Sequence, residues 1–467
     1  MTTTTALDLA DCQTLPLPDA GLSHGAIASV VGATTLVPLA DGTTTTYANL
    51  DIAASAPALE AVAARIEQIL PWYASVHRGA GYLSQVATSL YESARTIIAE
   101  FCGARSDDLT VIVRNTTDAV NLLATATPGD VLVLDVEHHA NLLPWRTTEH
   151  QVTTVPAADT ITETLSRLDE ALQARSYALL AITGASNVTG EALPLSQVID
   201  IAHRHGTRVL VDAAQLAPHR RFSIAELDID YAVLSGHKLY APYGAGVLVG
   251  RRDWLDQAPA YLAGGGAVSH VSNDDVSWQQ GPARHEAGSP NVLGAVALAT
   301  AAQVLTDIGD DRLQQHDQVL RTQLTDGLSK IDGVTIARIW QDSGEPVGVV
   351  TFEVADYEPG LVAMYLSAEH GIGVRDGKFC AHPLLRRIGL SDGAVRASIG
   401  LGTTSEHIDR LLVALQRLVT EGPREQYRVE GGAWVLANDR RPLPINLGLD
   451  ELIATAAATC GQIRPPV

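Results

Sequence analysis

Short apolar runs alternate with helical patterns through the middle of the chain. The runs cover residues 111–113, 131–134, 178–182, 209–211, 231–234 and 247–249. Helical segments lie between them, such as residues 195–205, which end at Gly206. This alternation predicts an α/β fold with a mostly parallel sheet and helices on both of its faces.

The flanking segments show other patterns. Residues 1–46 are rich in Thr, Pro and Gly and predict an arm with at most one helix, at 25–31. Apolar positions from 59 to 70 predict a helix that Pro71 closes. Beyond residue 300, runs at 334–339, 348–352 and 395–399 predict strands of a smaller α+β domain. A helix is expected at 407–419, with Thr403 and Glu406 as a capping box.

These patterns divide the chain into four parts. We expect an N-terminal arm at 1–46 that joins the small domain, a large cofactor-binding domain at 47–300, and a small α+β domain at 301–420. Residues 421–467 form an extension of unknown role, with an apolar run at 433–437 and a last helix near 449–457.

Polar side chains follow the apolar runs where strands are expected to end. They are Asn115, Thr116 and Thr117, then His138, Asn187, Asp212 and Lys238. In parallel sheets, ligands gather at the carboxyl ends of the strands, so we expect these residues to surround one site.

The residue types at this edge suit one cofactor. Thr116 and Thr117 begin a predicted helix, whose N-terminus is a phosphate site. His138 offers a flat ring for stacking, Asp212 a carboxylate for a ring nitrogen, and Lys238 an amine for a Schiff base. Together they predict a pyridoxal phosphate (PLP) site.

Taken singly, each residue has a plainer interpretation. Lys238 fits a surface turn, because lysine is rarely buried unless paired. Asp212 and Thr116 fit local helix caps, and His138 fits a core histidine. Their joint placement at successive strand ends favours the cofactor.

Composition and charge narrow the function further. The chain has 32 basic and 53 acidic residues, a net charge of −21, which argues against nucleic acid or an anionic membrane as partner. No signal peptide pattern or run of about 20 apolar residues is present. Four scattered cysteines show no metal-ligand spacing. We expect a cytoplasmic protein with reduced thiols that acts on a small molecule and binds no metal.

Four segments resemble the motifs of one known family. They are residues 137–145 (EHHANLLPW), 211–215 (VDAAQ), 235–240 (SGHKLY) and 286–291 (EAGSPN). They are similar to motifs of the cysteine desulfurase and selenocysteine lyase group, which are class V, fold-type I PLP enzymes. The resemblance runs from about Tyr47 to Val419 and implies a seven-stranded sheet in the large domain.

The resemblance implies a role for each matching residue. Lys238 would hold PLP and move the Cα proton, Asp212 would pair with the ring nitrogen, Gln215 would contact the ring hydroxyl, and His138 would stack on the ring. The phosphate would be held by Thr117, Ser235 and His237, and by Ser289 from the partner subunit of a homodimer. The remaining implied residues bind the substrate or line the entrance: Arg396, Asn187, His77, Arg78 and Arg375.

Cys380 lies in a glycine-bearing polar loop, at the nucleophile position of the resembled family. Removal of sulfur from cysteine needs a thiolate, and Arg375, Lys378 and His382 nearby favour that form. The alternative is a buried structural cysteine, since free cysteines are often buried.

The chain departs from the family pattern at Asn115, His285, Asp376 and the pair Lys378-Phe379. Asp376 follows Arg375 directly and Phe379 makes the cysteine loop less polar, so these changes bear on the choice of substrate.

The resemblance implies a desulfurase that acts on L-cysteine or a sulfur or selenium analogue, with a sulfur-acceptor protein as a further partner. One alternative is a C–S lyase or class V aminotransferase in which Cys380 is incidental. Another is a catalytically silent scaffold, against which the intact Lys238 and Asp212 argue.

Overall fold

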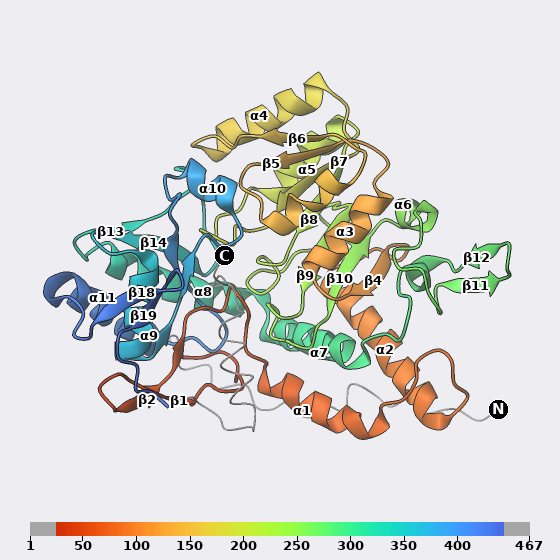
Figure 1. Cartoon of the computed structure of the whole chain (residues 1–467). Coiled ribbons are helices and arrows are strands. Elements are labelled where there is room, and N and C mark those ends of the chain that lie inside the picture. Colours follow the sequence, from red (N-terminus) through yellow and green to blue (C-terminus); the bar gives the residue numbers. More distant parts are fainter. Residues whose placement is uncertain (1–24, 443–467) are drawn as a thin grey trace.

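A computed structural model describes residues 25–442, and its larger part is built on one sheet (Figure 1). The strand order is β4-β10-β9-β8-β7-β5-β6. All neighbouring pairs are parallel except those of β10, which is antiparallel to β4 and β9. The predicted mostly parallel, seven-stranded sheet is therefore confirmed. Its strands are β4 (Leu109–Val113), β5 (Val131–Leu134), β6 (Val152–Val155), β7 (Leu179–Thr183), β8 (Arg208–Asp212), β9 (Tyr231–Ser235) and β10 (Gly246–Gly250).

Both faces of this sheet are covered by helices, which is why its strands read as continuous apolar runs. In β5, Leu132 and Leu134 belong to one core, and Val131 and Val133 to the core on the opposite face. The first core includes α1 (Glu60–Ile69), α2 (Tyr82–Phe101), α4 (Ile161–Ala174), α5 (Leu195–Arg204) and α7 (Val292–Ile308). The second includes α3 (Thr116–Ala126) and α6 (Arg252–Gln257).

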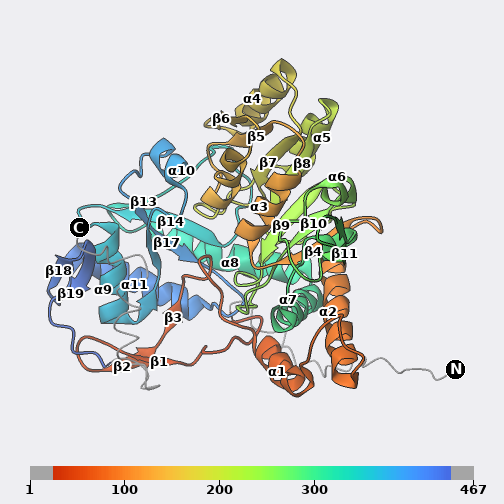
Figure 2. The same cartoon turned by 45° about the vertical axis from the view of Figure 1, so that its right-hand side comes forward.

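A smaller antiparallel sheet forms the second domain, with strand order β13-β14-β17-β16 (Figure 2). Helices α8, α9 and α11 pack around a separate core, whereas Leu384 and Leu385 of α10 pack in the core of the large domain. The longest of them, α8, joins the two domains, because its Leu313 packs in the large core and its Leu320 in the small one. The elements are β13 (Val334–Ile336), β14 (Val349–Val354), β16 (Arg375–Gly377), β17 (Ala394–Ser398), α8 (Asp310–Leu328), α9 (Pro359–His370), α10 (His382–Arg387) and α11 (Ser405–Glu421).

The N-terminal segment packs on the small domain through strand pairing. β1 (Leu36–Pro38) and β2 (Thr44–Thr46) form a hairpin, and β3 (Ala48–Asn49) pairs in parallel with β15 (Ile372–Gly373). Ala48 and Leu50 lie in the small core. The domain boundaries expected at 46, 300 and 420 stay predictions.

Two predicted local structures were wrong. No helix forms at 25–31, because the backbone N–H groups of Ile27 and Ala28 donate to the carbonyl of Leu401 instead. The capping box of α11 uses Thr404 and His407. Thr403 is occupied elsewhere, since its hydroxyl accepts a hydrogen bond from the Gly400 N–H.

Two hairpins complete the described chain. β11 (Val268–Val271) and β12 (Val276–Trp278) project beside the large sheet in Figure 1. The predicted apolar run near 433–437 forms β19 (Ala433–Leu436), paired with β18 (Tyr427–Glu430). The helix expected at 449–457 lies outside the described residues. Within residues 25–442, no single helix is long and apolar enough to span a membrane; α7 and α8 meet that test only as a pair bent by 84°.

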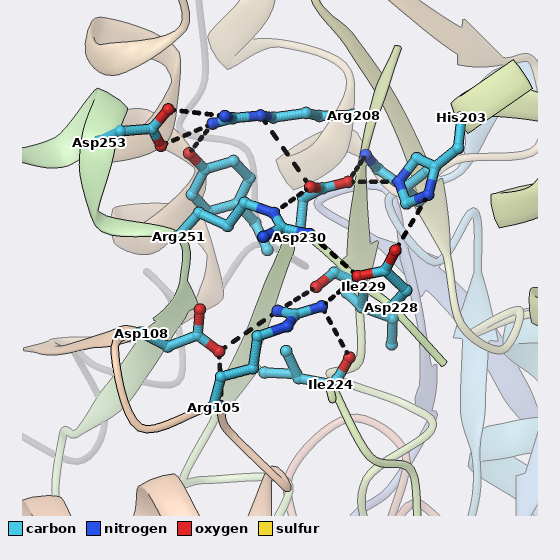
Figure 3. A network of polar contacts seen from close by, with 12 residues as sticks. Arg105, Asp108, His203, Arg208, Ile224, Asp228, Ile229, Asp230, Arg251 and Asp253 are labelled. Carbon is cyan, nitrogen blue, oxygen red and sulfur yellow. Dashed lines mark hydrogen bonds and ion pairs between the residues drawn. The ribbon is translucent and has the colours of Figure 1, made fainter. Parts of the chain in front are cut away.

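A buried carboxylate, Asp230, ties together several strand ends of the large sheet (Figure 3). Its Oδ2 contacts the His203 ring at 2.8 Å and accepts from the Val209 N–H at 2.9 Å. Its Oδ1 accepts from Arg251 Nε at 2.6 Å, and its side chain is 3% exposed. Asp230 precedes β9, so this network lies at the opposite end of the strand from Lys238.

We expect Asp230→Ala to lower the free energy of unfolding by about 3 kcal/mol, because it leaves the buried Val209 N–H without its acceptor and removes one of the two carboxylates that pair with Arg251. Urea unfolding measures this. Asp253→Ala is the matched control: its carboxylate also pairs with an arginine, Arg208, but is 47% exposed, so the loss should stay below about 1 kcal/mol. Equal losses in the two variants would contradict the prediction.

Candidate active site

The predicted chemical residues come together at the carboxyl ends of the large sheet's strands. They line a cavity of about 650 Å³ to which the small domain also contributes. Of the predicted set, the lining includes Thr116, Thr117, His138, Asn187, Asp212, Gln215, Ser235, His237, Lys238, Arg375, Cys380 and Arg396.

Lys238 follows β9 and lies at the centre of this arrangement. Burial lowers the pKa of its amine to about 8, and the nearby Asp212 carboxylate opposes that shift. Burial also raises the pKa of Asp212 at the end of β8, although the Ala214 N–H donates to its Oδ1 at 3.0 Å and Lys238 is close. A cationic ring nitrogen beside Asp212 would supply the counter-charge that this buried carboxylate lacks.

His138 follows β5, and its ring orientation is fixed by its own backbone. Its Nδ1 accepts a hydrogen bond from the Ala140 N–H at 3.0 Å. Burial, followed by the charge of Lys238, lowers the pKa of this histidine to about 3. The ring is therefore neutral at physiological pH, and a neutral ring stacks on a pyridinium without charge repulsion.

The start of α3 forms the anion-binding end of the cavity. Asn115 caps the helix by accepting from the Asp118 N–H, which leaves Thr116 and Thr117 in the first turn. The Ser235 hydroxyl donates to Thr116 Oγ1 at 2.9 Å and accepts from the Thr116 N–H at 2.8 Å. Ser235 therefore joins β9 to this helix terminus, where backbone dipoles favour a phosphate.

Arg396, in β17 of the small domain, is a positively charged residue in the wall of the Lys238 cavity. It is 3% exposed, donates to the Asn187 carbonyl at 2.8 Å, and pairs with Asp51 Oδ1 at 3.4 Å. Its Nε has no hydrogen-bond partner within the described chain. Burial lowers its pKa to about 10, which leaves it charged. A carboxylate ligand would satisfy the free donor.

The Cys380 loop is anchored over the cavity. The His139 N–H donates to the Cys380 carbonyl at 2.9 Å, and the Asn187 amide donates to the Phe379 carbonyl at 2.8 Å. Phe379 and Cys380 both have positive φ values, 50° and 53°. Cys380 is exposed and faces the cavity, so the alternative of a buried structural cysteine is wrong.

His77 and Arg78 do not line the Lys238 cavity of their own chain. They line a second cavity of about 490 Å³ together with Gly288 and Pro290, which flank Ser289. Arg78 donates to the Gly265 and Gly288 carbonyls at 2.5 and 3.1 Å. Within one chain, the structure thus groups these three predicted residues together but apart from Lys238.

Sequence reasoning missed residues that reach the site from the N-terminal segment. Tyr47, Asn49 and Asp51 line the cavity because β3 pairs with β15. No local motif marked them. Glu137 was quoted in a motif without a role: it is fully buried, and burial raises its pKa to about 8. Its position among the polar residues that follow the run 131–134 had marked it as a candidate, but not its role.

These residues fit PLP on several independent points. The Gln215 Oε1 is buried and has no hydrogen-bond partner within the described chain. The helix terminus suits the phosphate, Asp212 the ring nitrogen, and the Lys238 amine, with its lowered pKa, the aldehyde. Among the described residues, no cluster of metal-ligating side chains occurs.

Comparisons with known proteins agree with this geometry. The aminotransferase class-V family model matches residues 48–411. A probable cysteine desulfurase of Mycolicibacterium paratuberculosis is 37% identical over 76% of this chain, although the chain spans only 53% of that relative's length. A cysteine desulfurase of Pectobacterium atrosepticum is 36% identical over 79% of this chain and 93% of its own.

A solved structure shows the same fold. The apo cysteine desulfurase of Thermococcus onnurineus superposes with a TM-score of 0.74 at 31% identity, covering 80% of this chain and 94% of its own. The family's enzymes use PLP, in agreement with the cavity described above. The chain therefore belongs to the class V aminotransferase family.

Proposed function

We propose that this protein is a cysteine desulfurase: it removes sulfur, or selenium, from L-cysteine or a close analogue to give alanine. The observation that carries the proposal is that Cys380 lines the same cavity as Lys238 and Arg396. A nucleophilic thiol, a proton acceptor and a carboxylate-binding cation thus surround one space. The relatives named as cysteine desulfurases support this activity.

Arg396 orients the substrate. Its unpartnered Nε and its guanidinium charge receive the amino acid's carboxylate, while Asp51 and the Asn187 carbonyl hold the other nitrogens in place. Arg375 lies directly opposite Arg396 in the β16–β17 pairing and adds a second positive charge to the cavity wall. This fixes the substrate with its Cα toward Lys238.

Lys238 moves the proton. Bound PLP would supply an electron sink conjugated to the substrate's Cα. The lowered pKa leaves roughly a tenth of the Lys238 side chains as free amine at pH 7, far more than for an ordinary lysine, and this amine accepts the Cα proton. Asp212 would hold the ring nitrogen, His138 would cover the ring face, and Thr116 and Thr117 would hold the phosphate.

Cys380 takes the sulfur. Its thiolate attacks the substrate sulfur, an S–S bond forms as the C–S bond breaks, and the electron pair of that bond stays with the substrate carbon, which gains a proton. The products are alanine and a Cys380 persulfide, so no external oxidant or reductant is consumed. A second thiol, from a reductant or an acceptor protein, then removes the outer sulfur.

Enzymes of this family commonly act as dimers. We propose a homodimer in which Ser289, with His77 and Arg78, reaches the partner's cavity. Support comes from exposed apolar side chains close in sequence to His77, which include Trp72, Tyr73 and Tyr82 at 41%, 53% and 66% exposure. The cytoplasmic location and the acceptor protein stay predictions.

The pH dependence of cofactor capture follows from the pKa of Lys238. The neutral amine is the nucleophile, so capture of added PLP by the apoenzyme should speed up as the pH rises through about 8 and level off above it. Growth of the visible absorbance of bound cofactor measures this. Lys238→Ala should show no such absorbance, and a flat profile in the wild type would contradict the prediction.

The role of Cys380 is tested with holoenzyme, L-cysteine and a reductant. We expect alanine and sulfide from the wild type and neither from Cys380→Ala. Cys102→Ala is the matched control, because Cys102 is fully buried and burial raises its pKa to about 12. It should keep full activity.

Other outcomes of that assay would overturn the proposal. Pyruvate as the product, or full activity of Cys380→Ala, would identify a C–S lyase. A 2-oxo acid with transfer of the amine would identify an aminotransferase. Absence of turnover with any amino acid, despite bound cofactor, would favour a silent scaffold.

The homodimer is tested by light scattering. We expect twice the 49.4 kDa of one chain. Tyr82→Glu should shift the mass toward that of the monomer, because it places a charge among the exposed apolar side chains that we propose to lie in the interface, such as Trp72 and Tyr73. Val413→Glu is the control: Val413 is 53% exposed on α11 of the small domain. A monomeric wild type would rule the homodimer out.

A further inference from the structure

In the Cys380 loop, the side chain of Phe379 is buried between two exposed neighbours. The Ala381 N–H donates to the Lys378 carbonyl at 2.9 Å, which closes a four-residue turn with Phe379 and Cys380 at its centre. Both central residues have positive φ values, as in a type I′ turn. Lys378 and Cys380 are exposed, whereas Phe379 is only 8% exposed. The turn therefore places an aromatic ring inside the protein one residue before the thiol.

The Phe379 ring lies against the guanidinium of Arg396. The Cζ atom of Arg396 is 5.1 Å from the centroid of the ring, and both residues line the Lys238 cavity. A cation within about 6 Å of a ring centroid is attracted by the electron-rich face of the ring. Arg396 is itself buried, so little water competes with this contact. The ring thus helps to compensate a buried positive charge.

The edges of the same guanidinium have other partners. Its Nη1 donates to the Asn187 carbonyl at 2.8 Å and its Nη2 to Asp51 Oδ1 at 3.4 Å, whereas its Nε has no partner among residues 25–442. A carboxylate binds a guanidinium at its edge, in the plane of the N–H groups, whereas an aromatic ring stacks on its face. Phe379 therefore covers a face of Arg396 and leaves an edge open to a substrate carboxylate.

Asn187 joins Phe379 and Arg396 by a second route. Its backbone carbonyl accepts from Arg396, and its side-chain amide donates to the Phe379 carbonyl at 2.8 Å. The three residues thus form a closed set, in which each one bonds or packs against both of the others. A displacement of the loop consequently changes the surroundings of the arginine, and a displacement of the arginine changes those of the loop.

We propose that Phe379 is a positioning residue that couples occupation of the carboxylate site at Arg396 to docking of the Cys380 loop. A bound carboxylate fixes the guanidinium under the ring, and the docked ring holds the guanidinium for the carboxylate. By thermodynamic linkage, each event favours the other by the same free energy. The ligand that engages this coupling is an α-amino acid, whereas an amine without a carboxylate does not engage it.

This coupling belongs to the chain's own loop, because Phe379 is one of the positions at which the chain departs from the family pattern. The proposal rests on the proposed amino-acid site at Arg396 but not on the removal of sulfur.

The coupling is tested on the wild-type holoenzyme with L-alanine and ethylamine, which differ only by the carboxylate. Each ligand is added until the visible absorbance of the bound cofactor stops changing. Alkylation of Cys380 by iodoacetamide is then followed on its own peptide by mass spectrometry. We expect L-alanine to slow alkylation about fivefold more than ethylamine does, the equivalent of about 1 kcal/mol. Equal rates with the two ligands would overturn the proposal without any variant.

Two substitutions at one position separate the ring from its bulk. Phe379→Leu removes the aromatic face and keeps an apolar side chain. The difference between L-alanine and ethylamine should disappear in this variant, and the dissociation constant of L-alanine should rise about fivefold. Phe379→Tyr keeps the face and should match the wild type in both measurements. A full difference in Phe379→Leu, or equal losses in the two variants, would overturn the proposal.

A double-mutant cycle shows whether the ring acts through Arg396. Arg396→Met keeps a long side chain but removes the charge and the guanidinium face. Without ligand, Phe379→Leu should speed alkylation of Cys380 about fivefold in the wild-type background and have little effect in the Arg396→Met background. The same acceleration in both backgrounds would show that the ring acts by packing alone and would overturn the proposal.

The coupling and the proposed function fail in distinguishable ways. If the protein is not a desulfurase, L-cysteine gives no alanine and sulfide, yet the two ligands still differ in the wild type and not in Phe379→Leu. If the coupling is absent, L-cysteine still gives alanine and sulfide, and Phe379→Leu responds to both ligands as the wild type does.

Discussion

A lysine and an aspartate buried at the ends of two neighbouring strands set the requirements for the rest of the site. Neither Lys238 nor Asp212 is stable in its charged form without compensation, and each moderates the pKa shift of the other. The pair persists because a sheet covered on both faces holds the strand ends rigidly. Most side chains that line the cavity around it are polar, so a charged cofactor ring would meet fixed dipoles there.

The large sheet and the residues expected to bind the cofactor could be predicted from the sequence for a physical reason. Strands buried on both faces are continuous apolar runs, and β5 was predicted with its observed bounds, Val131–Leu134. The edge strand β6 was missed, because only Val155 of its four residues is fully buried. Parallel strands share a carboxyl edge, so residues that follow successive runs, such as Asp212 and Lys238, had to meet.

Other parts depend on contacts between distant segments and left no local signal. Asp51 joins the site only because the N-terminal strand β3 pairs with β15. The segment 25–31 is not helical, because Leu401 takes its N–H groups. For the extension beyond 421, the sequence predicted an apolar run and a last helix but no hairpin. The hairpin packs on α9, where Trp434 donates to Glu358 at 2.9 Å and Tyr427 to Glu369 at 2.8 Å. These pairings are tertiary and not encoded in any short motif.

Two hydrogen bonds hold the cysteine loop over the cavity against the cost of the left-handed backbone at Phe379 and Cys380. Each non-glycine residue in that conformation costs about 1–3 kcal/mol, and the two hydrogen bonds from His139 and Asn187 offset part of that cost. A change of about 1.4 kcal/mol alters the ratio of docked to released loop tenfold. The loss of one of these two hydrogen bonds would therefore change the fraction of time that Cys380 spends over the cavity several-fold or more.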